Sequence, residues 1–173
     1  MEILENSKET PGNITEALGS STETLKNSTE TPGNSTETLG NRAIYILDSY
    51  AVLAYFQKEK GSDIIKELLE KAAQNQCNLY FCIINLGEVV YITEKERGLP
   101  AAQMALSLIK ELPIEVVIAN EEITLEAAHI KANYPIAYAD CFAAAVAKKF
   151  QGLLVTGDPE FKLLQNYIDI MWI

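Results

Sequence analysis

Two aspartates stand where predicted buried strands end. Asp48 directly follows the apolar run 43–47, and Asp158 follows the apolar run 153–156 after a single glycine. Short continuous apolar runs of this kind are typical of buried strands in a parallel sheet. In an open α/β sheet, the functional site lies beyond the carboxyl ends of the strands. We therefore expect both carboxylates at that edge.

Two further acids belong to helices that border the same predicted edge. Glu88 is expected in the first turn of the helix that follows a second apolar run, three residues after Asn85 and on nearly the same face. Asp140 lies in the opening turn of an alanine-rich helix, 138–150, where an apolar face would otherwise be expected. The candidate site thus contains Asp48, Glu88, Asp140 and Asp158.

Four neighbouring carboxylates would repel one another strongly unless a cation neutralised them. A set of oxygen ligands without histidine or cysteine favours Mg²⁺ or Mn²⁺ over zinc. One or two such cations can activate water, hold a phosphate and stabilise the leaving oxygen. The pattern therefore predicts metal-dependent phosphoryl chemistry.

Three of these acids also have a purely structural explanation. Asp158 precedes Pro159 and could be a helix N-cap. Asp140 could be a first-turn charge favoured by the helix dipole, and Glu88 an exposed helix acid. Asp48 is the hardest to explain in this way, because an ionised carboxylate at the end of a buried strand needs a partner.

Strands and helices alternate along residues 43–173, which predicts an α/β class with a mostly parallel sheet. Apolar runs predict strands at 43–47, 79–84, 114–118, 153–156 and 168–172. Helical patterns and stop signals predict helices at 51–58, after Gly61-Ser62, at 85–96, 100–111, 121–133 and 138–150, and a short helix from Asp158-Pro159.

Residues 1–42 form a separate leader built on a seven-residue repeat rich in Asn, Ser, Thr and Glu. Proline or glycine closes most repeats, and the composition offers too little apolar area to offset the entropy of ordering, so we expect disorder. The leader holds seven glutamates and three basic residues, so it contributes −4 to the net charge of −10. The globular part therefore carries −6, and the acidity of the whole chain argues against binding nucleic acid through a basic face.

Other residue patterns exclude several classes of protein. Cys77, Cys82 and Cys141 form no CxxC pair, which predicts buried free thiols rather than disulfides or a zinc site. A single histidine, His129, leaves Ser-His-Asp and Cys-His hydrolases without support. No segment approaches the roughly 18 apolar residues of a membrane span, and no secretory signal is evident, so we expect a cytoplasmic protein.

Four motifs in order along residues 43–173 resemble the PIN-domain ribonucleases, in particular the VapC-like toxins of type II toxin-antitoxin pairs. They are ILDS at 46–49, INLGEV at 84–89, YADCFAAA at 138–145 and LVTGDPEF at 154–161. Each motif alone is weak, but their order and spacing together are specific. The resemblance implies a three-layer α/β/α fold and a Mg²⁺- or Mn²⁺-dependent endoribonuclease.

The resemblance also assigns residues and partners. It implies that Asp48, Glu88 and Asp140 hold one metal, that Asp158 completes the site or serves a second ion, and that Ser49, Asn85 and Thr156 support the acids. It implies hydrolysis of RNA to a 5′-phosphate and a 3′-hydroxyl, a homodimer, and a small antitoxin that blocks the site. Lys148 and Lys149 could contact the RNA backbone, although bases in a last helical turn are also favourable dipole partners.

Three rival interpretations remain. A haloacid-dehalogenase-type phosphatase also begins with a strand and an aspartate, but it needs a second acid where this chain has Tyr50. A PIN fold could be kept as a non-catalytic binding or scaffolding module. A housekeeping RNA-processing nuclease would share the chemistry of a toxin, so the four acids do not separate those two.

Overall fold

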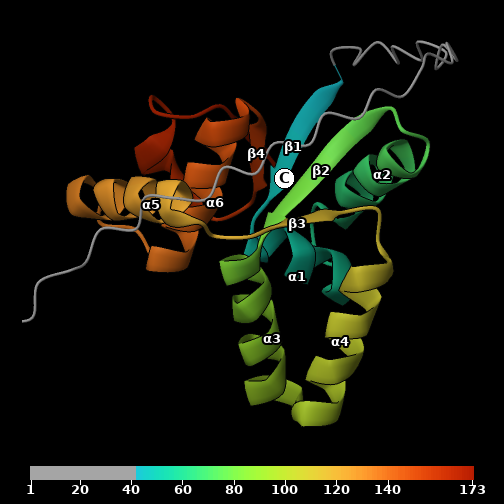
Figure 1. Ribbon diagram of the computed structural model, residues 1–173. Helices are drawn as coiled ribbons and strands as arrows, with labels where there is room; N and C mark the ends of the chain where they lie inside the picture. Colours follow the sequence, from blue (N-terminus) through green and yellow to red (C-terminus); the bar gives the residue numbers. More distant parts are fainter. Residues whose placement is uncertain (1–41) are drawn as a thin grey trace, which may run out of the picture. The chain divides into compact units, whose positions relative to one another are not determined.

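The computed structural model describes residues 42–173, which form one α/β unit (Figure 1). The predicted disorder of the leader at 1–42 falls outside these residues, apart from Arg42, and stays a prediction. Among the described residues, no helix is both long enough and apolar enough to cross a membrane.

Five parallel strands build the central sheet, in the order β3-β2-β1-β4-β5. Their bounds are β1 Ala43–Leu47, β2 Cys77–Cys82, β3 Glu115–Val117, β4 Leu153–Thr156 and β5 Ile170–Trp172. In the middle of the sheet, Leu47 is in register with Phe81 of β2 and Val155 of β4. The chain segments that leave β1, β2 and β4 therefore emerge side by side at one edge.

Helices cover both faces of this sheet, which confirms the three-layer α/β/α fold (Figure 1). Successive residues of β1 point to opposite faces, so Ile46 packs in one core and Leu47 in the other. The Ile46 core is covered by α5 Glu121–Asn133, α6 Tyr138–Phe150 and the 3₁₀ helix η1 Pro159–Leu164. The Leu47 core is covered by α1 Ser49–Gln57, α2 Ser62–Ala73, α3 Ile83–Arg97 and α4 Leu99–Glu111. In Figure 1, α3 and α4 form a hairpin that extends away from the sheet.

The predicted strand 79–84 is wrong at its carboxyl end, because Ile83 and Ile84 already belong to α3. Two isoleucines after a buried run read as strand, but β1 ends at Leu47, opposite Phe81, so no partner backbone continues beside them. Glu88 consequently lies in the second turn of α3 rather than the first. The face shared with Asn85 is kept, since the spacing of three residues is unchanged.

The start of α1 also differs from the prediction, since the helix begins at Ser49 rather than residue 51. Asp48 is its N-cap and accepts a hydrogen bond from the backbone N–H of Ala51. The same aspartate therefore ends the central strand and starts the first helix. This double placement gives it little freedom to move.

Candidate functional site

Asp48 is held rigidly at the end of β1. Its side chain is 1% exposed, and both carboxylate oxygens accept hydrogen bonds. The N–H of Ala51 donates to Oδ1 at 2.7 Å, and the hydroxyl of Thr156 donates to Oδ2 at 2.5 Å. Thr156 ends β4, the strand beside β1, so the register of the two strands brings donor and acceptor together. Thr156, which the resemblance implied as a support of the acids, thus contacts Asp48.

Ser49 and Asn85 link the start of α1 to α3 and α6. The Ser49 hydroxyl lies 2.6 Å from Oε2 of Glu88, so it donates to that carboxylate. The amide of Asn85, which is fully buried, donates to Oγ of Ser49 at 3.2 Å and to the carbonyl oxygen of Ala139 at 3.1 Å. Oδ1 of Asn85 is buried without a hydrogen-bond partner among the described residues.

Asp140 and Asp158 complete the acids at this edge. Asp140 lies in the first turn of α6 and is only 8% exposed. Asp158 is half-buried and caps η1, because its Oδ1 accepts a hydrogen bond from the N–H of Glu160 at 2.8 Å. Its own N–H donates to the Thr156 hydroxyl at 2.9 Å. The helix-cap explanation for Asp158 is therefore confirmed, and its other carboxylate oxygen, Oδ2, accepts no hydrogen bond from residues 42–173.

The pKa values show that these acids share one electrostatic environment. Burial raises the pKa of Asp48 from 3.8 to about 7, against the hydrogen bonds from Thr156 and Ala51, and the charges of Asp158 and Glu88 raise it further. Burial likewise raises the pKa of Asp140 from 3.8 to about 7, followed by the charges of Asp48, Asp158 and Glu88. Within residues 42–173, no lysine or arginine forms an ion pair with any of the four. No lysine or arginine among the described residues therefore offsets the repulsion between these acids.

Residues 45–166 match the PIN domain family. The chain belongs to that family. The match contains all four motifs and all four acids, so the resemblance inferred from the motifs is confirmed.

Solved structures with toxin-antitoxin names share the fold of this PIN domain. VapBC2 from Rickettsia felis, bound to a promoter DNA fragment, has 20% identity and a TM-score of 0.59, over 74% of this chain and 97% of the other. DNA-bound VapBC from Salmonella typhimurium has 18% identity and a TM-score of 0.60, over 75% and 97%. VapC20 from Mycobacterium tuberculosis, a toxin that cleaves the sarcin-ricin loop, has 15% identity and a TM-score of 0.54, over 69% and 93%. No curated protein sequence matches the chain.

The acids of this PIN domain do not form a closed metal cage as they stand. Within residues 42–173, no three Asp, Glu, His or Cys side chains are grouped closely enough to hold a metal ion. Both oxygens of Asp48 and one oxygen of Glu88 accept hydrogen bonds from protein donors. The candidate ligands are nonetheless of the type that a hard divalent cation binds, since they are carboxylate oxygens and the unpartnered amide oxygen Oδ1 of Asn85.

Lys148 and Lys149 are engaged elsewhere on the PIN domain. Nζ of Lys148 lies 2.7 Å from Oε1 of Glu126 and 2.6 Å from the hydroxyl of Tyr167, and Lys149 pairs with Glu122. These bonds join the last turn of α6 to α5 and to the segment after η1. They supply a structural role for both lysines and give no support to RNA contact.

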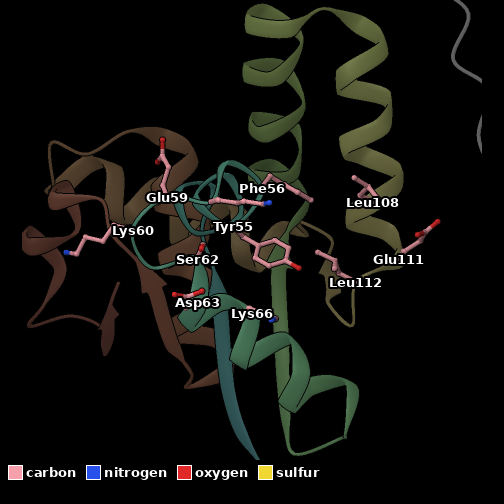
Figure 2. Close-up of a pocket in the computed structure, with 11 residues that line it drawn as sticks. Tyr55, Phe56, Glu59, Lys60, Ser62, Asp63, Lys66, Leu108, Glu111 and Leu112 are labelled. Carbon is pink, nitrogen blue, oxygen red and sulfur yellow. The ribbon is translucent and has the colours of Figure 1, made fainter.

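A cavity of about 900 Å³ (Figure 2) has none of the four acids among its lining residues. It is lined by the end of α1, the start of α2 and the end of α4, with Phe56, Lys66 and Leu108 among its residues. The three cysteines are buried and free, as the sequence predicted. Neither the cavity nor the cysteines add a chemical group to the acid edge, by which we mean the carboxyl edge of the sheet with its four acids, Asp48, Glu88, Asp140 and Asp158.

Proposed function

We propose that this PIN domain is a metal-dependent endoribonuclease and the toxin of a type II toxin-antitoxin pair. The observation that carries the proposal is the buried pair Asp48 and Asp140: burial raises the pKa of each to about 7, and no lysine or arginine among the described residues pairs with either. Burying such groups is costly unless something neutralises them. A family match to the PIN domain makes nuclease chemistry the natural use of that arrangement.

Mg²⁺ or Mn²⁺ is the proposed cofactor. Asp48, Glu88 and Asp140 would hold one ion, and Asp158 would complete the site or serve a second. A cation of this class supplies charge neutralisation and a nucleophilic water for attack on phosphorus. The proposed ligands are all carboxylates, which supports a hard oxygen-ligated ion over zinc.

The residues of the chain prepare this site in distinct ways. Thr156 and the N–H of Ala51 hold the carboxylate of Asp48 in one orientation. At neutral pH, Asp48 and Asp140 each carry a proton for part of the time, and those protons must leave as the cation binds. Glu88 must exchange its hydrogen bond from Ser49, or share it, to reach the ion.

Two partners belong to the proposal. Several solved structures that share the fold are named as toxin-antitoxin complexes, among them one from Klebsiella pneumoniae, which supports a cognate antitoxin for this chain. The RNA substrate follows from the proposed chemistry, and the name of VapC20 gives an RNA loop as the target of one protein with this fold. A homodimer remains a prediction.

The activity is tested by cleavage of structured RNA with the full chain in Mg²⁺ or Mn²⁺. We expect cleavage to stop with EDTA and in Asp48→Asn and Asp140→Asn. Asp63→Asn is the matched control, because it removes an exposed aspartate in the first turn of α2. Unchanged cleavage by Asp48→Asn would exclude the proposed metal site.

The biological role needs a separate test. We expect expression of the chain to arrest growth and co-expression of a small neighbouring gene product to relieve the arrest. Cleavage in vitro without growth arrest would instead favour a housekeeping nuclease. A chain that neither cleaves RNA nor binds Mn²⁺ would favour the non-catalytic module.

A further inference from the structure

A series of hydrogen bonds runs from Asp48 through Asp158 and Glu160 to the start of α6, the helix that carries Asp140. It begins at Asp48, whose Oδ2 accepts from the Thr156 hydroxyl, which in turn accepts from the N–H of Asp158 at 2.9 Å. Oδ1 of Asp158 accepts from the N–H of Glu160 at 2.8 Å. Oε2 of Glu160 then accepts from the N–H of Ala137 at 3.2 Å, across 23 residues of sequence. The last bond reaches the residue that starts α6.

The start of α6 lacks a cap from its own segment. Its N-cap residue is Ala137, and no side chain of the local sequence makes a cap hydrogen bond. In contrast, Asp48 caps α1 and Asn120 caps α5 with their own side chains. A helix start leaves N–H groups without partners and carries partial positive charge, so a carboxylate is favoured there. Glu160 provides this acceptor from η1.

The other side of the same helical turn is held by α3. Nδ2 of Asn85 donates to the carbonyl oxygen of Ala139, two residues after the Ala137 N–H that Glu160 accepts. Asp140 follows directly, so the backbone that leads into it is fixed at both points. Asn85 also contacts Ser49, which is bonded to Glu88. The hydrogen bonds thus pass from β1 through β4, η1, α6 and α3 back to the start of α1.

We propose that Glu160 is a positioning residue of the acid edge, which fixes the first turn of α6 so that Asp140 faces Asp48 and Asp158. The inference rests on the proposed nuclease function and adds a residue outside the four acids and their predicted supports. Glu160 is exposed, and its bond to Ala137 lies at the surface. Such a bond contributes little to the free energy of folding, so its main effect is on geometry.

The test compares Glu160→Ala with Glu160→Gln in the full chain. Alanine removes the acceptor for the Ala137 N–H, whereas glutamine keeps an oxygen acceptor and removes only the charge. Loss of a residue that orients a metal ligand typically weakens metal affinity or activity by 10–100-fold, so we expect Glu160→Ala to bind Mn²⁺ about tenfold more weakly by calorimetry. Glu160→Gln should recover to within about threefold of the wild type. Glu121→Ala, an exposed first-turn acid of α5, is the control.

Two further measurements separate positioning from stability and from the proposed function. We expect Glu160→Ala to lower the unfolding midpoint by less than about 2 °C, because the bond is exposed. We expect faster amide hydrogen exchange in residues 137–141 of Glu160→Ala but not of Glu160→Gln, a result that does not depend on RNA cleavage. If the wild type cleaves no RNA while this exchange difference is present, the nuclease proposal fails and the positioning role stands.

Three results would overturn the positioning role itself. The first is wild-type hydrogen exchange in Glu160→Ala, which would mean that the bond does not hold the start of α6. The second is an equal loss of Mn²⁺ affinity in Glu160→Ala and Glu160→Gln, which would assign the effect to charge. The third is a large fall in the unfolding midpoint of Glu160→Ala, which would attribute its weaker Mn²⁺ binding and faster hydrogen exchange to general destabilisation.

Discussion

The four acids at the carboxyl edge of the sheet form one group, and Glu126 with its partners Lys148 and Tyr167 forms a second group with different surroundings. At the carboxyl edge of the sheet, burial and neighbouring carboxylates raise the pKa of Asp140 to about 7. On the outer side of α5 and α6, burial also works to raise the pKa of Glu126, but hydrogen bonds from Lys148 and Tyr167 outweigh it and lower the pKa. Similar side chains thus acquire opposite properties from their neighbours.

The difference separates a structural acid from one that still needs a partner. Glu126 has its cation within the fold, at 2.7 Å, and Lys148 also lies over the ring of Tyr167. Among the described residues, the groups that shift the pKa values of Asp48 and Asp140 are neutral hydrogen-bond donors and other acids. Lysine pairs with one of these acid sites, whereas at the other no lysine or arginine of the described residues does, so that other site stays available to a cation from solution.

The largest expected difference between the two groups is in RNA cleavage. Asp140→Asn should lower cleavage by roughly a hundredfold or more, because it removes a charge that the cation needs. Glu126→Gln should leave cleavage within about twofold, since Glu126 pairs with Lys148 and contacts none of the four acids. Initial rates at saturating Mn²⁺ measure both. Equal losses in the two variants would remove the functional distinction between the groups.

The pH dependence of stability should also differ between the two groups. Asp48 and Asp140 have folded-state pKa values of about 7 against 3.8 when unfolded, so the folded chain holds more protons between these values. Stability of the cation-free protein should therefore be full below pH 4 for these two groups and fall as pH rises to about 7, by on the order of a few kcal/mol. Glu126, whose pKa is lowered, contributes in the opposite sense, since its stability is lost as pH falls.

Denaturant unfolding in EDTA at pH 5 and pH 8 measures this effect. Excess Mn²⁺ should restore stability at pH 8, by about 2.7 kcal/mol when its concentration is a hundred times its Kd. Asp140→Asn should flatten the pH profile and lose the response to Mn²⁺. A wild-type profile that rises from pH 5 to pH 8 in EDTA would contradict the raised pKa values at the acid edge.

Deletion of one hydroxyl at the acid edge should have a smaller effect. Thr156→Val keeps the shape of the side chain but removes the donor to Oδ2 of Asp48. The carboxylate would lose part of its orientation and its pKa would rise further, so we expect Mn²⁺ to bind about tenfold more weakly. Calorimetry on the cation-free chain measures the change. Thr156→Ser, which keeps the hydroxyl, serves as the control and should recover most of the affinity.

Sequence patterns predicted the fold better than they predicted the electrostatics of the acids. The apolar runs located β1 and β4 correctly, because a buried parallel strand is apolar on both faces. The end of β2 was misplaced, since it depends on where the neighbouring strand stops, which no local pattern records. The order of the motifs indicated the four acids, and the structure brings them into one electrostatic environment.

Sequence patterns did not predict the hydrogen bonds and ion pairs between distant segments. The bond from Ala137 to Glu160 joins residues 23 positions apart, and Glu160 reads locally as an ordinary exposed acid after Pro159. Likewise, the pairing of Lys148 with Glu126 needs α5 and α6 to be packed together before the charges can meet. A local rule can place a charge on a helix face, but the partner of that charge comes from tertiary packing.

We expect the smallest effect from removing the Tyr167 hydroxyl beside Glu126, the counterpart of the Thr156 hydroxyl beside Asp48. Tyr167→Phe removes a hydrogen bond to Glu126 and the partner of Lys148 at 2.6 Å, while the ion pair between Glu126 and Lys148 remains. Because this cluster is partly exposed, the free energy of unfolding should fall by only about 0.5–1 kcal/mol. Mn²⁺ affinity should stay unchanged, in contrast to Thr156→Val, as denaturant unfolding and calorimetry on the same sample would show. A change in Mn²⁺ affinity as large as that of Thr156→Val would mean that the two clusters are coupled through α6, and the distinction between a self-compensated acid group and a cation-dependent one would no longer hold.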